Sequence, residues 1–87
     1  MTRSISIRVD GNSKIGLGHI VRCTALAHIL KQDFEVAFFC RNIPEAIAHE
    51  ILKCGFNLTI LDDEDTFLRY VNNNILSMII ISLSNFE

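Results

Sequence analysis

A glycine-rich loop that ends in a histidine is the part of the sequence best suited to chemistry. Gly16 and Gly18 precede His19, and Arg22 follows His19 by one helical turn. Glycines let backbone N–H groups approach a ligand closely, and a helix N-terminus favours an anion. The helix dipole there disfavours imidazolium, so His19 is suited to act as a neutral base. The run therefore suggests an anion site that contains a general base.

Each of these residues also has a purely structural interpretation. A strand–glycine–helix turn can form without any ligand, and the residues alone leave both interpretations open. Asp10 either bonds polar groups of a ligand, or orients His19, or organises the loop as an Asx turn. Arg22 either meets a phosphate or carboxylate on the His19 side of the helix, or makes a surface ion pair.

The two best-known phosphate motifs do not fit this loop. Gly11 and Gly16 have the spacing of a Walker A loop, but Leu17 stands where that motif has lysine. The Gly16–Gly18 pair lacks the third glycine of a dinucleotide fingerprint, and Arg41 stands where an acidic residue would end the second strand. A classical dinucleotide site is therefore not expected.

The spacing of apolar residues alternates between strand and helix periodicity along the chain. Leu26 is expected on the buried side of the first helix and Leu68 on that of the third. Asn42 and Pro44 open the second helix, and Gly55 ends it. Strands are expected over 5–9, 35–40, 57–61 and 78–81, with helices over 18–31, about 44–54 and 64–72.

This alternation predicts an α/β fold with a parallel sheet and helices on both faces. The periodicity gives about four strands, and right-handed crossovers favour the order 3-2-1-4, with the third helix opposite the first two. Ligands bind such sheets at the carboxyl ends of the strands where the order reverses, here strands 1 and 4. The glycine loop follows strand 1, so topology and loop chemistry predict the same location.

Composition narrows the classes of function. The 87 residues are expected to form a single domain, 1–87, and a net charge of −2 gives no basic surface for nucleic acid. Three cysteines without a CxxC pair indicate neither zinc nor a disulfide framework and fit the cytoplasm. The run 78–81 is too short to span a membrane, and no signal peptide is recognisable.

The run R-x-D-G-x-x-x-I-G-x-G-H-x-x-R over 8–22, followed by a strand that ends at Phe39-Cys40-Arg41, resembles a known family. It is similar to the UDP-sugar hydrolases of pseudaminic acid biosynthesis and the related spore-coat polysaccharide biosynthesis proteins. These resemble GT-B glycosyltransferases, which have two Rossmann domains. The resemblance covers nearly all of this chain but only the first domain of the family.

The resemblance implies a Rossmann-like, GT-B-type half-domain that acts on a UDP-sugar. By position, His19 is the general base whose water displaces UDP from the anomeric carbon of a diacetamido-trideoxy-altrose, with neither a metal nor a cofactor. The residues expected to contact the substrate are Asp10, Gly16, Gly18 and Arg22.

Two departures from the family predict that the chain is inactive alone. The second domain, which holds most of the uridine and diphosphate contacts, is absent. Ser82 and Ser84 stand where the family commonly has an aspartate and a tyrosine. A serine hydroxyl supplies neither a carboxylate charge nor a phenol ring, so the sequence is expected to be a truncated relative of the hydrolase.

Two alternatives remain open from the sequence. The chain could be a non-catalytic binding or self-associating module that forms a homodimer through the uncovered edge of the strand at 78–81. It could also be the remnant of a glycosyltransferase, since that class has the same architecture.

Overall fold

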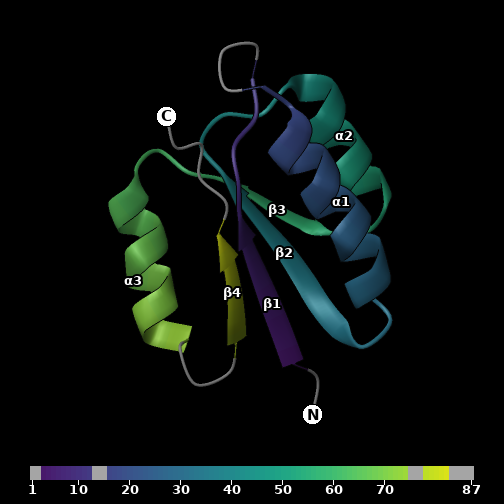
Figure 1. The fold of residues 1–87 in the computed structure, drawn as a ribbon. Helices are drawn as coiled ribbons and strands as arrows, with labels where there is room; N and C mark the ends of the chain where they lie inside the picture. The colour runs from purple at the N-terminus through teal and green to yellow at the C-terminus, as the bar shows by residue number, and fades with distance from the viewer. Residues whose placement is uncertain (1–2, 13–15, 75–77, 83–87) are drawn as a thin grey trace.

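The described residues form four strands that run parallel in one sheet with the order β3-β2-β1-β4 (Figure 1). The computed structural model describes residues 3–12, 16–74 and 78–82. The α/β class with a parallel sheet, predicted from the alternating periodicity, is confirmed. The strands are β1 (Arg3–Arg8), β2 (Phe34–Cys40), β3 (Asn57–Ile60) and β4 (Met78–Ser82), and the helices are α1 (Gly18–Leu30), α2 (Glu45–Lys53) and α3 (Glu64–Asn74).

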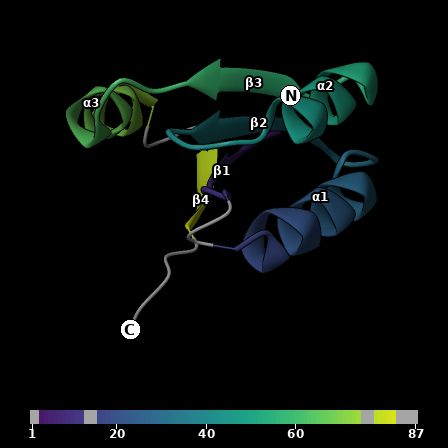
Figure 2. The ribbon, with the colours of Figure 1, turned by 90° about the horizontal axis from the view of Figure 1, so that it is seen from above.

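The helices form two layers, with α1 and α2 on one side of the sheet and α3 on the other (Figure 2). Phe38 and Phe39 of β2 illustrate how the sheet holds both layers, because neighbouring residues of a strand point to opposite faces. Phe38 belongs to the core beneath α1 and α2, and its ring meets that of Phe56 edge-on at 5.6 Å. Phe39 packs instead against Phe67 of α3, with ring centroids 5.2 Å apart.

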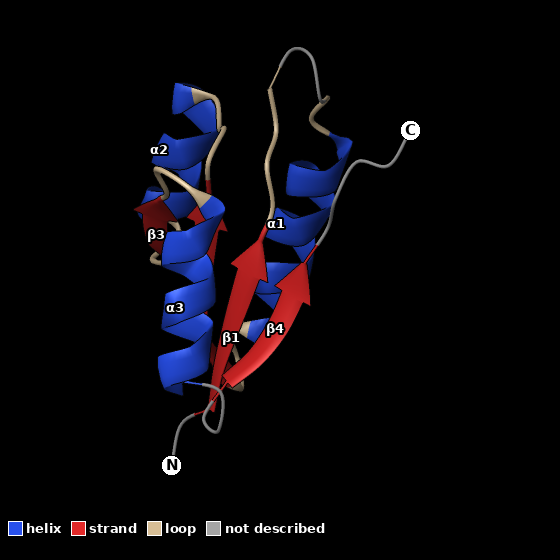
Figure 3. Cartoon of the chain, turned by 90° about the vertical axis from the view of Figure 1, so that its left-hand side faces the viewer, coloured by secondary structure: helices blue, strands red, loops and turns tan. Residues whose placement is uncertain are grey.

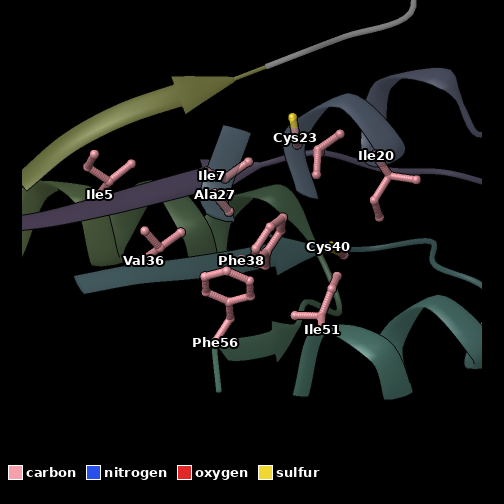
Figure 4. Packing of buried hydrophobic residues seen from close by; sticks show 11 residues of the cluster. Ile5, Ile7, Ile20, Cys23, Ala27, Val36, Phe38, Cys40, Ile51 and Phe56 are labelled. Carbon is pink, nitrogen blue, oxygen red and sulfur yellow. The ribbon is translucent and has the colours of Figure 1, made fainter. Parts of the chain in front are cut away.

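The larger core lies between the sheet and the α1–α2 layer (Figure 4). Ile7 and Phe38 of the strands and Ile20 and Ile51 of the helices are completely buried there. Burial of such side chains stabilises the fold by about 1.5–3 kcal/mol each. This core holds α1 against β1 and β2, and so positions the loop that enters α1.

Two expected core positions lie outside the core. Leu26 of α1 is 37% exposed, and Leu68 of α3 is 53% exposed. The buried positions of α1 are Ile20, Cys23 and Ala27, spaced by three and four residues, and Leu26 falls beside this narrow stripe. In α3, Phe67 takes the buried place and leaves Leu68 on the adjoining side.

Local signals determine where α2 ends and where α3 begins. Gly55 follows α2 with φ +90°. Phe56 and Gly55 donate their backbone N–H groups to Ile51 and Leu52, in a Schellman motif. Asp63 begins α3 by accepting hydrogen bonds at Oδ1 from the N–H (2.9 Å) and hydroxyl (3.0 Å) of Thr66, which lower the pKa of Asp63.

Candidate functional site

The loops that follow β1 and β2 are bonded to each other at the carboxyl edge of the sheet. Val9 donates its backbone N–H to the Phe39 carbonyl (3.2 Å), and Gly11 donates to the Asn42 carbonyl (2.8 Å). These bonds extend the pairing of β1 with β2 beyond the last residues of the strands. The two loops therefore keep a defined relative position where a ligand of a parallel sheet is expected.

The Asp10 carboxylate is the side chain that ties these loops together. Its Oδ1 accepts hydrogen bonds from the backbone N–H groups of Arg41 (2.7 Å) and Asn42 (3.1 Å). Both of its oxygens also pair with Arg8, at 2.8 and 3.0 Å. Within the described residues no hydrogen bond joins Asp10 to His19, so its visible contacts organise the loops.

Arg8 is a buried charged residue near this edge, and the sequence alone did not indicate its role. The residue is only 7% exposed. The guanidinium binds Asp10 on one side and Glu64, the first residue of α3, on the other, with Nη2 2.9 Å from Glu64 Oε1. It also donates to the Phe39 carbonyl, at 3.4 Å. Arg8 therefore joins β1, β2, α3 and the Asp10 loop.

One signal for Arg8 was present in the sequence. Arg8 and Asp10 are two positions apart in an extended segment, so their side chains share one face. Opposite charges at that spacing indicate an ion pair. Nothing local indicates Glu64, which is 56 residues away in the chain.

The charges of this network stabilise one another. Burial opposes the positive charge of Arg8, but the hydrogen bonds and charges of Asp10 and Glu64 outweigh it and raise the pKa of Arg8. Burial alone would raise the pKa of Asp10 as well. Hydrogen bonds from Arg8 and from the Asn42 and Arg41 amides outweigh that effect and hold the Asp10 pKa below its ordinary value.

The pKa of Asp10 predicts a specific loss of stability in acid. A carboxyl whose pKa is lowered by folding contributes its stability above its unfolded-state pKa, about 3.9, and loses it as the pH falls through the folded-state value. The unfolding free energy of the wild type is therefore expected to decline more steeply below about pH 4 than that of Asp10→Asn. Urea unfolding across pH measures this, and Asp62→Asn is the control for losing one exposed carboxylate. Equal slopes for wild type and Asp10→Asn would contradict the prediction.

The glycines of the loop have distinct structural roles. Gly16 has φ +93° and donates its N–H to the Asn12 carbonyl at 2.8 Å, closing a short antiparallel bridge. Gly18 is the first residue of α1, and a Cβ placed there would lie 3.7 Å from Arg22 Nη2. Arg22 therefore lies beside the start of its own helix, near the loop that the sequence singled out.

His19 lies in the first turn of α1 and is half-buried. Because it is half-buried and lies at the start of α1, the imidazole is in neither the hydrophobic core nor the opposite rim of the sheet. Leu17, the N-cap residue of α1, makes no side-chain hydrogen bond to the first N–H groups of the helix. In Figure 3 the start of α1 lies at the end of the molecule toward which the β1 and β4 arrows point.

An open hollow of about 590 Å³ lies between the two loops. Of the residues expected to contact a ligand, none lines the hollow directly, but Leu17, between Gly16 and Gly18, does. The glycine loop therefore adjoins the hollow, while Asp10 holds the Arg41–Asn42 backbone behind it. The hollow is lined by Asn12, Leu17, Arg41, Asn42, Ile43 and Pro44.

Over 3–12, 16–74 and 78–82, no group of three or more His, Cys, Asp or Glu side chains is arranged to hold a metal ion. Among the helices of the same segments, none combines the length and apolar character needed to cross a membrane. Ser84 lies outside the described residues, as does the side chain of Ser82, so the loss of activity expected from these two serines stays a prediction.

Comparison with known proteins adds no relative to this description. No family model matches the chain, and neither a curated protein nor a solved structure matches it.

Gly11→Ala is expected to destabilise the fold by about 1–3 kcal/mol. A Cβ at this position would come within 2.8 Å of Ile20 Cγ2 and 3.3 Å of the Gly16 carbonyl oxygen, so the loop and α1 would have to separate. Urea unfolding measures the loss. Gly18→Ala is the matched control, since its Cβ meets only the Arg22 side chain, and it should not destabilise the chain. Full stability of Gly11→Ala would contradict the close packing.

The three cysteines are expected to react at different rates. Burial raises the pKa of Cys40 to about 12, with the Asp10 charge adding to the effect, and burial also raises the pKa of Cys23. Cys54 is only half-buried. Iodoacetamide at about pH 8 should therefore alkylate Cys54 first in the native chain, because the thiolate is the reactive form. Peptide mass spectrometry follows the sites, with guanidinium-unfolded chain as the control. Labelling of Cys40 as fast as Cys54 would contradict its burial.

Proposed function

We propose that the chain is the Rossmann-like, GT-B-type N-terminal half of a nucleotide-sugar hydrolase in the biosynthesis of pseudaminic acid or a related surface polysaccharide, acting in the cytoplasm. One observation carries the proposal. A half-buried histidine lies in the first turn of a helix at the carboxyl edge of a parallel sheet, two positions after Leu17, which lines an open hollow of about 590 Å³. The motif over 8–22 and a sheet in which β4 adjoins β1 also support it.

The proposed reaction is water attack at the anomeric carbon of the sugar. His19 accepts a proton from the water as its oxygen bonds to that carbon. The bond from the carbon to the diphosphate oxygen breaks, and UDP leaves with the electron pair. The lack of side chains at Gly16 and Gly18 allows close approach of the substrate, and the Arg22 guanidinium beside Gly18 offers positive charge to the leaving group.

Release of UDP tests the proposal. The substrate UDP-diacetamido-trideoxy-altrose is incubated with the chain alone, with the C-terminal domain of a family hydrolase alone, and with both. We expect UDP release only in the mixture, because the chain supplies the base and the added domain the nucleotide contacts. Robust turnover by the chain alone would overturn the dependence on a second domain. Absence of turnover in the mixture would overturn the proposal that the chain is part of a hydrolase.

A second candidate function, self-association, is favoured by the position of β4. In the described residues β4 pairs with β1 on one side and forms an edge of the sheet on the other. Its residues Met78–Ser82 include neither a charge nor a proline, the usual features that keep an edge strand from pairing. Light scattering after size exclusion distinguishes the candidates, since a strictly monomeric chain argues against edge pairing.

A further inference from the structure

We propose that Arg41 recognises an oxyanion attached to a sugar ring in the hollow between the β1 and β2 loops. The inference rests on the proposed function, and it assigns the charged contact of that site to a residue outside the glycine–histidine motif.

The lining of the hollow defines the chemistry of its ligand. Leu17, Ile43 and Pro44 supply apolar surface, and Asn12 and Asn42 supply amide groups that both donate and accept hydrogen bonds. Arg41 is the one charged residue among the described residues that line it. A ligand that matches these walls has an apolar side, several hydrogen-bonding groups and a negative charge, as a sugar phosphate or a sugar acid does.

Arg41 differs from Arg8 in the partners of its side chain. Arg8 is buried and satisfied by two carboxylates, whereas Arg41 is exposed and makes no salt bridge within the described residues. Two carboxylates near Arg41 already accept other hydrogen bonds. Asp10 pairs with Arg8, and Asp63, on which the Arg41 charge acts, accepts hydrogen bonds from Thr66. The Arg41 guanidinium therefore keeps its donors for a ligand.

The backbone of Arg41 is held in place although its side chain is exposed. Its N–H donates to Asp10 Oδ1 at 2.7 Å, and the next residue, Asn42, is bonded to both Asp10 and Gly11. An arginine whose backbone is fixed loses less freedom when it binds, because only the side chain must be ordered. Its planar fork then suits two-point contact with phosphate or carboxylate.

Two sources of the oxyanion share this chemistry: the phosphate joined to the anomeric carbon, and a carboxylate on the ring itself. The probes that separate them are N-acetylglucosamine 1-phosphate and glucuronate, with N-acetylglucosamine as the neutral control. None contains uridine, so binding does not depend on the nucleotide contacts of a second domain.

Amide NMR titrations of the full chain test the proposal. We expect at least one anionic probe to shift the amide signals of Asn12 and Asn42, and Arg41→Gln to weaken its binding by about 10–100-fold, the range for a hydrogen bond to a charged group. Arg41→Lys should lose only part of the affinity. Arg69→Gln, which removes an exposed arginine from α3, is the matched control and should bind as the wild type does.

The outcomes separate this inference from the proposed function. Arg41-dependent binding of the 1-phosphate or of glucuronate supports it and identifies the source of the anion. Equal affinity of wild type and Arg41→Gln overturns it, as does failure of the wild type to bind either anion. The UDP-release assay is independent, since Arg41-dependent binding without hydrolysis would support the anion site and overturn the hydrolase.

Discussion

Arg8→Met is expected to lower the free energy of unfolding by about 2–4 kcal/mol. Removal of the guanidinium leaves the Asp10 carboxylate, whose side chain is 22% exposed, without its cation. It also removes one of the two hydrogen bonds that the Phe39 carbonyl accepts, and the Glu64 contact that joins α3 to β1. Loss of one partner from a buried ion pair typically costs about 3–5 kcal/mol, and the partial exposure of both carboxylates reduces that figure here.

The effect is large for a chain of this size. A domain of 87 residues has about 4–13 kcal/mol of total stability, so the substitution removes a substantial part of it. Urea unfolding followed by circular dichroism gives the difference. If Arg8→Met is too unstable to purify, Glu64→Gln provides a second measurement, with an expected loss under about 1 kcal/mol because Glu64 is 47% exposed.

Two further variants show whether the ion pair itself is responsible. Arg3→Met is the matched control, because Arg3 lies on the same strand but is exposed, and its loss should cost under about 0.5 kcal/mol. The double variant Arg8→Met/Asp10→Asn removes the unpaired charge while an amide oxygen can still accept from the Arg41 backbone. It should recover about 1–3 kcal/mol relative to the sum of the single changes. Strict additivity would contradict a direct coupling.

His19→Gln is expected to lower kcat of the two-domain mixture by about 10²–10⁴-fold, the usual contribution of a general base. Glutamine keeps the size and polarity of the side chain but accepts no proton at neutral pH. The change should act on kcat much more than on KM, since the base acts in the transition state. Initial rates of UDP release over a range of substrate concentrations measure both constants.

The matched control for this prediction is His49→Gln. His49 is an exposed residue of α2 and lies outside the hollow, so its substitution should leave the rate within about twofold of the wild type. Both variants should have the same midpoint of urea unfolding as the wild type. A His19→Gln variant that hydrolyses the substrate at the wild-type rate would remove His19 from the mechanism.

The sequence alone determined the class of the fold, because the signals for it are local. Alternating periodicities predicted strands and helices close to those observed, and Gly55 ended α2 because its positive φ suits glycine. The same reasoning was wrong for Leu26 and Leu68. Helical spacing identifies an apolar side but not the width of the stripe that the sheet covers.

Some residues of the candidate site could likewise be recognised from the sequence, and others only from the tertiary structure. The glycine loop and His19 were recognisable because they are contiguous, and Arg8 with Asp10 could have been paired from their spacing. Only the tertiary structure joined Glu64 to Arg8 and placed Arg41 beside the hollow. Those partners meet because crossovers return distant segments to one edge of the sheet, and the resulting contacts depend on how the layers pack, which no local pattern of residues encodes.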